Sequence, residues 1–228
     1  MSKIKYLLIT LTIALILVFT QSSIKAEPSS NAIELRQLAQ TLTKSGREQL
    51  DRGNAASALQ TWSEATKIYT RLHYQEGIVG SLINQSLAFK AEWQYYLSCD
   101  VLMEALQPKF GSCTLALTLT NQPANSLSQA IAKIEALPIN AIGLQNLGDV
   151  LRGLGKLDEA KQALAKALIL AKQLNLPILS EIFLGLGNVE ESSFFQARDR
   201  YSDIDNPVSR NELANSIQQK VILALDFY

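Results

Sequence analysis

Small residues recur at fixed intervals in the segment NLGDVLRGLGKLDEAKQALAKALILA, which runs from Asn146 to Ala171. Gly148 and Ala160 stand where two antiparallel helices would touch, because only small side chains allow such a close approach. Gly155 lies between the two apolar runs and is predicted to take the left-handed conformation that ends the first helix. The segment therefore predicts a helix, a turn and a second helix packed on the first.

The Gly-Lys pair within this segment is typical of a turn and not of a phosphate-binding loop. The string GLGKL at 153–157 lacks the spacing and the Ser or Thr of such a loop. It also follows a helical pattern, whereas a phosphate-binding loop follows a strand.

Apolar residues at intervals of three and four run through most of the remaining chain, and no stretch alternates polar and apolar residues for long. This pattern predicts an all-α fold. The helix–turn–helix pattern recurs, which predicts about three and a half repeats near 39–72, 79–107, 141–174 and 180–195. An insertion at 108–140, with one extra helix, separates the second repeat from the third. The residues expected to pack the repeats are Gly46, Ala58, Trp62, Ala65, Phe89, Leu102, Leu147, Gly148, Leu151, Gly155, Ala160, Leu164, Ala167 and Gly187.

The pattern of leucine, glycine and alanine from Leu144 to Ala167 resembles the tetratricopeptide repeat (TPR), with leucines where that repeat often has aromatic residues. The strings ALQTWSEATKIYTRL, QEGIVGSLINQSLAF, INAIGLQNLGDVLRGLGKLDEA and ALDFY are similar to the repeat region of exported bacterial proteins, many of them cyanobacterial, that carry a C-terminal CHAT domain. That domain has a caspase-like fold, and none of its motifs stands in this chain. The resemblance implies a right-handed α-solenoid of helix pairs across the domain at 35–200, without the CHAT domain.

The N-terminus has the pattern of an export signal. Lys3 and Lys5 precede an uncharged apolar run at 7–19, and Ala26 offers a small residue for cleavage, so residues 1–26 are predicted to be a signal peptide. The alternative is an uncleaved membrane anchor formed by residues 7–19. With either outcome the body of the chain is exported, to the periplasm, to the medium or to the membrane surface. Residues 27–34 are expected to be a linker.

The C-terminal part is expected to differ from the repeats. Residues 201–212 are polar and turn-rich, which predicts a loop. Residues 213–228 are predicted to form a helix that belongs to an interrupted repeat.

Composition and residue content give no support for catalysis or nucleic-acid binding. The chain has 21 basic and 21 acidic residues, so no net charge favours nucleic acid. The single histidine, His73, is expected to be an exposed turn residue, and one histidine with two distant cysteines makes no zinc site. The adjacent carboxylates Asp158–Glu159 and Glu190–Glu191 are interpreted as solvated charges or helix-start residues. We therefore expect no enzyme activity, no cofactor and no metal.

Cys99 and Cys113 are a candidate disulfide pair, because an exported chain can hold a disulfide. Two unpaired, half-buried thiols are the alternative.

The first helices of stacked pairs line the inner face of a helical array, and such arrays bind extended peptides or helices there. The candidate groove residues are Lys44, Arg47, Asn84, Lys90, Gln145, Asp149 and Arg152. The sequence thus predicts a non-catalytic, exported protein-interaction module whose partner is a protein or peptide. One alternative is a truncated or split sensing region of a CHAT-type protease. Another is a structural role at the membrane if the N-terminal segment is retained.

Overall fold

The structure, a computed structural model, describes residues 30–106, 112–113 and 125–201, together with residues 211, 214, 215 and 218. Within these residues every regular element is a helix, which confirms the predicted all-α class for this part of the chain. Residues up to Glu34 belong to one unit and residues from Leu35 onward to another. The packing described below is that of the second unit. Its helices are α2 (Ser30–Asp51, which begins in the first unit), α3 (Ala55–Arg71), α4 (Gln75–Ala91), α5 (Tyr95–Leu106), α7 (Asn125–Ala132), α8 (Pro138–Gly153), α9 (Leu157–Gln173) and α10 (Leu179–Tyr201).

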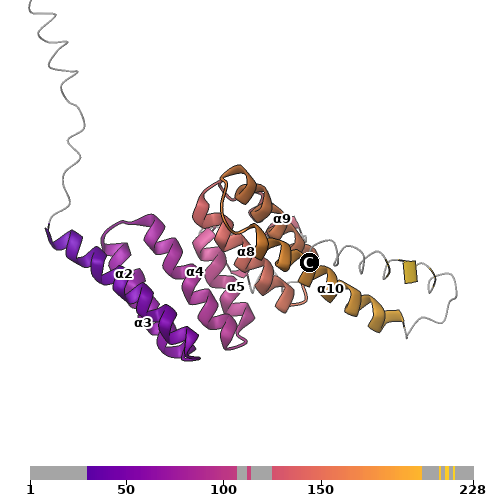
Figure 1. Cartoon of the computed structure of the whole chain (residues 1–228), viewed down its shortest axis with the longest axis horizontal. Helices are drawn as coiled ribbons and strands as arrows, with labels where there is room; N and C mark the ends of the chain where they lie inside the picture. Colours follow the sequence, from indigo (N-terminus) through magenta and orange to yellow (C-terminus); the bar gives the residue numbers. More distant parts are fainter. Residues whose placement is uncertain are drawn as a thin grey trace, which may run out of the picture. The chain divides into compact units, whose positions relative to one another are not determined.

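Neighbouring helices pack in succession along the chain (Figure 1). Helix α3 packs on α4, α4 on α5, α5 on α8, α8 on α9, and α9 on α10. The first helices of neighbouring pairs also touch, since α8 contacts both α4 and α10. Helix α7, which corresponds to the predicted extra helix, lies against α9.

One turn geometry joins the helices. The helices form three pairs, α2 with α3, α4 with α5, and α8 with α9. Gly53, Trp93 and Gly155 end the first helix of each pair, and each has a positive φ, of 80°, 60° and 72°. The N–H of each donates to the carbonyl three residues earlier, and the next N–H donates to the carbonyl five residues before it. This is the bonding of a Schellman-type helix end, and Gly155 takes the conformation that the sequence predicts. His73 and Asn175 make the same turn between pairs, with φ of 50° and 51°.

Small residues bring the paired helices together. Gly46 on α2 lies directly beneath the indole of Trp62, and a Cβ added to Gly148 on α8 would lie 2.5 Å from Leu164 Cγ. In the middle pair Ser86 replaces the glycine, and the Ser98 hydroxyl donates to the Ser86 carbonyl oxygen at 2.8 Å. The predicted packing residues are buried, except half-buried Phe89 and Gly155, which is exposed in its turn.

Several boundaries differ from the predicted ones. Helix α2 begins at Ser30, so residues 30–34 of the expected linker are helical. Helix α8 begins at Pro138, inside the expected insertion, because proline lacks an N–H and its fixed φ suits the first turn of a helix. Helix α10 continues past residue 195 to Tyr201.

The predicted signal peptide, most of the loop at 201–212 and most of the helix at 213–228 lie outside the described residues. Of the helices that are described, none combines the length and apolar character that crossing a membrane requires.

The close contact at Gly148 predicts opposite effects for two glycine substitutions in helix interiors. Gly148→Ala should lower the free energy of unfolding by about 1–2 kcal/mol, because overpacking against Leu164 exceeds the gain in helix propensity. Gly80→Ala on α4 should raise it by about 0.5–1 kcal/mol, because the nearest atom to its added Cβ, Ile139 Cδ1, is 3.8 Å away. Urea denaturation of both variants measures the difference, and equal effects would contradict this account of the helix contact.

Candidate binding surface

The seven candidate groove residues lie on the first helices of three pairs. Lys44 and Arg47 are on α2, Asn84 and Lys90 on α4, and the other three on α8. Lys44 and Arg47 are exposed, whereas the residues on α4 and α8 are half-buried. The structure joins five of the seven in two separate sets of polar contacts, Arg47 with Asn84, and Lys90 and Gln145 with Asp149.

Arg47 links the first pair to the second. Its Nη2 donates a hydrogen bond to Asn84 Oδ1 at 3.2 Å, from α2 to α4. Its guanidinium carbon lies 5.9 Å from the centre of the Trp62 ring, at the outer edge of the range for a cation–π contact. The indole that packs over Gly46 therefore also supports the arginine at the surface.

Asp149 links the second pair to the third. Its Oδ2 accepts a hydrogen bond from Gln145 Nε2 at 3.2 Å and lies 3.5 Å from Lys90 Nζ on α4. Its Oδ1 lies 3.7 Å from the Cβ position of Gly185 on α10. The carboxylate of Asp149 on α8 thus lies near both α4 and α10. Because it is partly buried, solvent screens its charge less.

Arg152, one turn after Asp149, has a different environment. Its Nε is buried, and no acceptor among the described residues binds it. A buried donor without an acceptor is rare, since desolvating it costs roughly 1–3 kcal/mol, and more when the group is charged. The last turn of α8 therefore carries a cation with unused bonding capacity.

The two cysteines of the chain are joined in a disulfide. Cys99 on α5 bonds to Cys113, with the two Cα atoms 5.8 Å apart, and both residues are buried. The bond ties the start of the insertion to the second pair and leaves neither sulfur as a free thiol.

The interpretation of Glu190 as a solvated charge is wrong. Its side chain is only 3% exposed and forms an ion pair with Lys161 Nζ on α9. Glu190 falls on the stripe of Ile182 and Leu186, spaced by four residues, so helical periodicity was a signal of its burial. Its neighbour Glu191 is exposed, and Asp158 and Glu159 stand in the first turn of α9 as expected.

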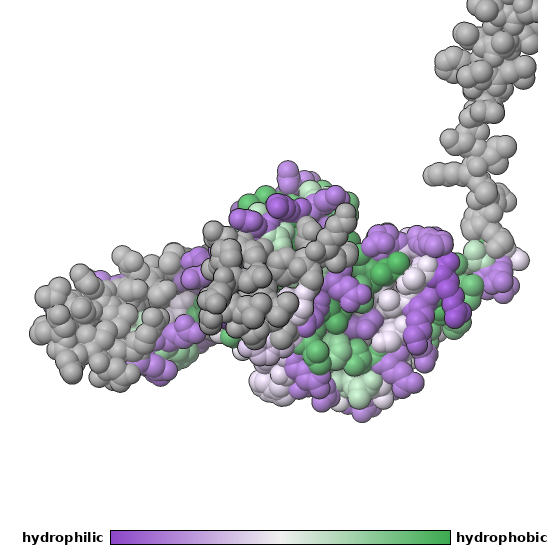
Figure 2. Space-filling model, turned by 180° about the vertical axis from the view of Figure 1, so that it is seen from behind, coloured by the Kyte–Doolittle hydropathy of each residue, from purple (hydrophilic) through white to green (hydrophobic). Residues whose placement is uncertain are grey.

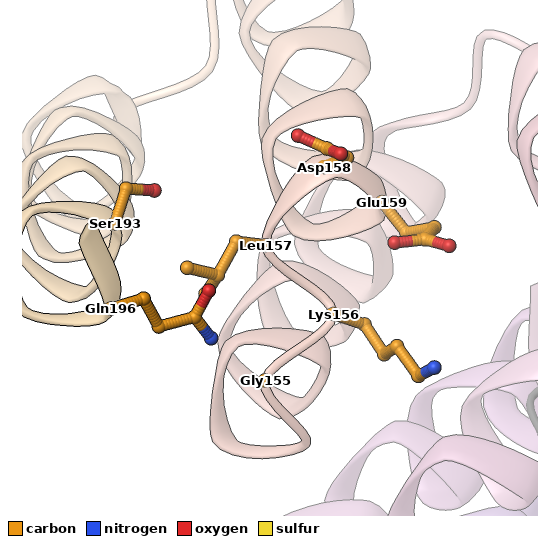
Figure 3. Close-up of a pocket in the computed structure, with 7 residues that line it drawn as sticks. All are labelled: Gly155, Lys156, Leu157, Asp158, Glu159, Ser193 and Gln196. Atoms are coloured by element: carbon orange, nitrogen blue, oxygen red, sulfur yellow. The ribbon is translucent and has the colours of Figure 1, made fainter. Parts of the chain in front are cut away.

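A surface pocket of about 340 Å³ lies apart from the groove residues, between the α8–α9 turn and α10. Leu157 and Gln196 point toward each other across it, whereas Lys156 and Glu159 extend to the other side of the turn (Figure 3). The residues that line the pocket are Gly155, Lys156, Leu157, Asp158, Glu159, Ser193 and Gln196.

The described residues hold no group of three or more His, Cys, Asp or Glu side chains placed to bind a metal ion. His73 is exposed in the turn between α3 and α4, as the sequence predicts.

Comparisons with known proteins leave the family open. No protein-family model matches the chain, and no curated protein matches it.

The disulfide closes a short loop, with 14 residues of separation, so its removal should destabilise the protein. We expect reduction to lower the free energy of unfolding by about 3 kcal/mol, because the unfolded chain gains the entropy of the opened loop. Denaturation with and without reductant measures this loss. The paired variant Cys99→Ala/Cys113→Ala should be insensitive to reductant, and an equal response in both proteins would contradict the assignment.

The Lys161–Glu190 pair predicts strong coupling between the two residues. Lys161→Met should cost roughly 2 kcal/mol of stability, because it leaves a buried carboxylate without its cation, and the partial exposure of Lys161 moderates the loss. The double variant Lys161→Met/Glu190→Met should recover most of that stability, since no buried charge remains. A double-mutant cycle in urea tests the coupling, which additive effects would exclude.

Proposed function

We propose that this protein is a non-catalytic interaction module that binds a peptide or helix of another protein along its first helices. The observation that carries the proposal is two sets of polar contacts that link three of these helices in succession. One set joins Arg47 on α2 to Asn84 on α4. The other joins Lys90 on α4 to Asp149 on α8, which also accepts a hydrogen bond from Gln145.

The architecture that suits this function is a TPR-like, right-handed α-solenoid. Support comes from the succession of packed helices, from the repeated turn at Gly53, Trp93 and Gly155, and from the contacts of α8 with α4 and α10. In a solenoid each repeat contacts its neighbours, and the first helices form an extended binding surface.

Polar side chains on this surface suit recognition of a peptide. Arg47 is exposed and offers donors beyond its bond to Asn84, and the half-buried Arg152 forms no ion pair among the described residues. Arginine forks bind carboxylates and backbone carbonyls with defined geometry. The surface therefore has donors for the backbone and acidic groups of a bound segment.

Export of the module is part of the proposal. The basic start, the apolar run at 7–19 and Ala26 favour a signal peptide. The Cys99–Cys113 disulfide supports an oxidising compartment, where such bonds persist.

Affinity capture from the exported fraction of the producing cells tests the function. The wild-type protein should retain a specific protein, and crosslinks should map to α2, α4 and α8. The variant Arg47→Glu/Lys90→Glu/Arg152→Glu should bind it at least about tenfold more weakly, because it reverses the charge of the surface. Since Lys90→Glu also breaks the pair with Asp149, Arg47→Gln/Arg152→Gln provides a second variant with that pair intact.

The control variant Lys67→Glu/Arg71→Glu/Lys133→Glu changes three exposed cations away from the proposed groove. It should retain the partner at wild-type strength. Equal retention by the groove variants, with helical content unchanged by circular dichroism, would reject the groove.

A further inference from the structure

Trp93 departs from two ordinary preferences of a folded protein, the burial of large apolar side chains and a negative φ for bulky residues. Its side chain is 79% exposed, and its backbone has a φ of 60°. The left-handed region is unfavourable for a bulky residue, and Gly53 and Gly155 occupy it in the equivalent turns. Because the exposed indole gains little from burial, the stability of the fold does not explain a tryptophan at this position.

The turn of Trp93 lies beside the end of α8. The Trp93 and Tyr95 rings are 6.1 Å apart in an edge-to-face arrangement. The Tyr95 ring in turn covers the backbone of Gly153, where an added Cβ would be 2.5 Å from Tyr95 Cε1. One turn earlier, Lys90 reaches Asp149, so α4 and α8 end side by side.

Two cations near Gly153 in sequence, Arg152 and Lys156, have no paired anion among the described residues. Arg152 precedes Gly153 and has a buried Nε without an acceptor. The carboxylate of Asp149, one turn away, already forms an ion pair with Lys90 and accepts a hydrogen bond from Gln145. Lys156 follows in the next turn, and its side chain extends away from α10 (Figure 3).

Acidic residues also stand near this edge. Glu92 is exposed beside Trp93, and Asp158 and Glu159 follow Lys156 in the first turn of α9, so the edge carries no excess of positive charge. Arg152 remains without an ion pair in the described part of the chain, because Asp149 pairs with Lys90. Further apolar area comes from Tyr96 and Leu97, which are exposed at the start of α5. Hydrophobic residues reach the surface among hydrophilic ones on the face of the described helices seen in Figure 2.

We propose that this edge, formed by Trp93, Tyr95, Arg152 and Lys156, binds an acidic segment of the partner protein. An apolar side chain of that segment packs on the Trp93 indole, and a neighbouring carboxylate accepts hydrogen bonds from Arg152. An acidic residue of the segment complements Arg152, which has no anion of its own among the described residues. Tryptophan and arginine are also among the residues that most often anchor interfaces. This inference rests on the proposed function and names the chemistry of the partner.

The test uses a displayed library of random peptides selected on the full-length protein. The recovered peptides should combine a carboxylate with a nearby apolar side chain. Binding of a synthetic peptide of that sequence should shift the emission of exposed Trp93 to the blue, whereas Trp62, the other tryptophan, is already buried. Trp93→Gly and Arg152→Gln should each weaken binding roughly tenfold, and higher salt should weaken the wild-type complex.

Trp93→Gly separates binding from folding. Its melting temperature should equal or exceed that of the wild type, because glycine adopts the left-handed conformation without strain and the lost side chain is exposed. Ile169→Ser, which removes an exposed apolar side chain on α9, and Lys67→Gln on α3 should both leave the affinity for the selected peptide unchanged.

Three results would overturn the inference. The first is a selection that recovers no acidic peptide. The second is peptide binding that Arg47→Gln abolishes and Trp93→Gly leaves intact. That result would assign the peptide site to the groove and would agree with the proposed function. The third is a blue shift with phosphatidylglycerol vesicles but none with any acidic peptide, which would assign the edge to a membrane surface. The capture experiment on the exported fraction decides the proposed function separately.

Discussion

Contact between a small residue on one helix and a large or polar residue on the next is the constraint on which the described architecture depends. Gly148 allows Leu164 to approach so closely that even a methyl group would collide with it. Ser86 and Ser98 achieve a similar approach through a hydrogen bond to the backbone. Because packed interiors tolerate little change in volume, these positions fix the distance between the helices of a pair.

Fixed distances within pairs have consequences at the surface. Helix α8 lies against α4 although the disulfide-bonded insertion and α7 separate them in sequence. Lys90 and Asp149 meet because of this, and Asp149 also approaches Gly185 of α10. The polar contacts that carry the proposed function are therefore a product of helix packing. No local sequence motif contains both Lys90 and Asp149.

Two residues at one edge of this surface depart from local preferences. Trp93 takes a conformation that glycine adopts in the equivalent turns, and Arg152 leaves a buried donor without an acceptor. By contrast, the buried charge of Glu190 has its cation, Lys161. Natural proteins violate local preferences mainly at sites that do something other than stabilise the fold. The edge thus differs from the core, where local and tertiary preferences agree.

The sequence by itself determined the helical class, the positions of the turns and the small residues between helices. Each of these follows from spacing within a few residues, which a period of 3.6 and the preferences of glycine encode directly. It placed the groove residues on the first helices but misassigned Glu190, whose environment depends on Lys161 of another helix. Only the tertiary structure decided which side chains pair, which carboxylate is shared and which donor of Arg152 stays unused. Such contacts join residues far apart in the chain, and their geometry is set by how helices pack, which local periodicity does not encode.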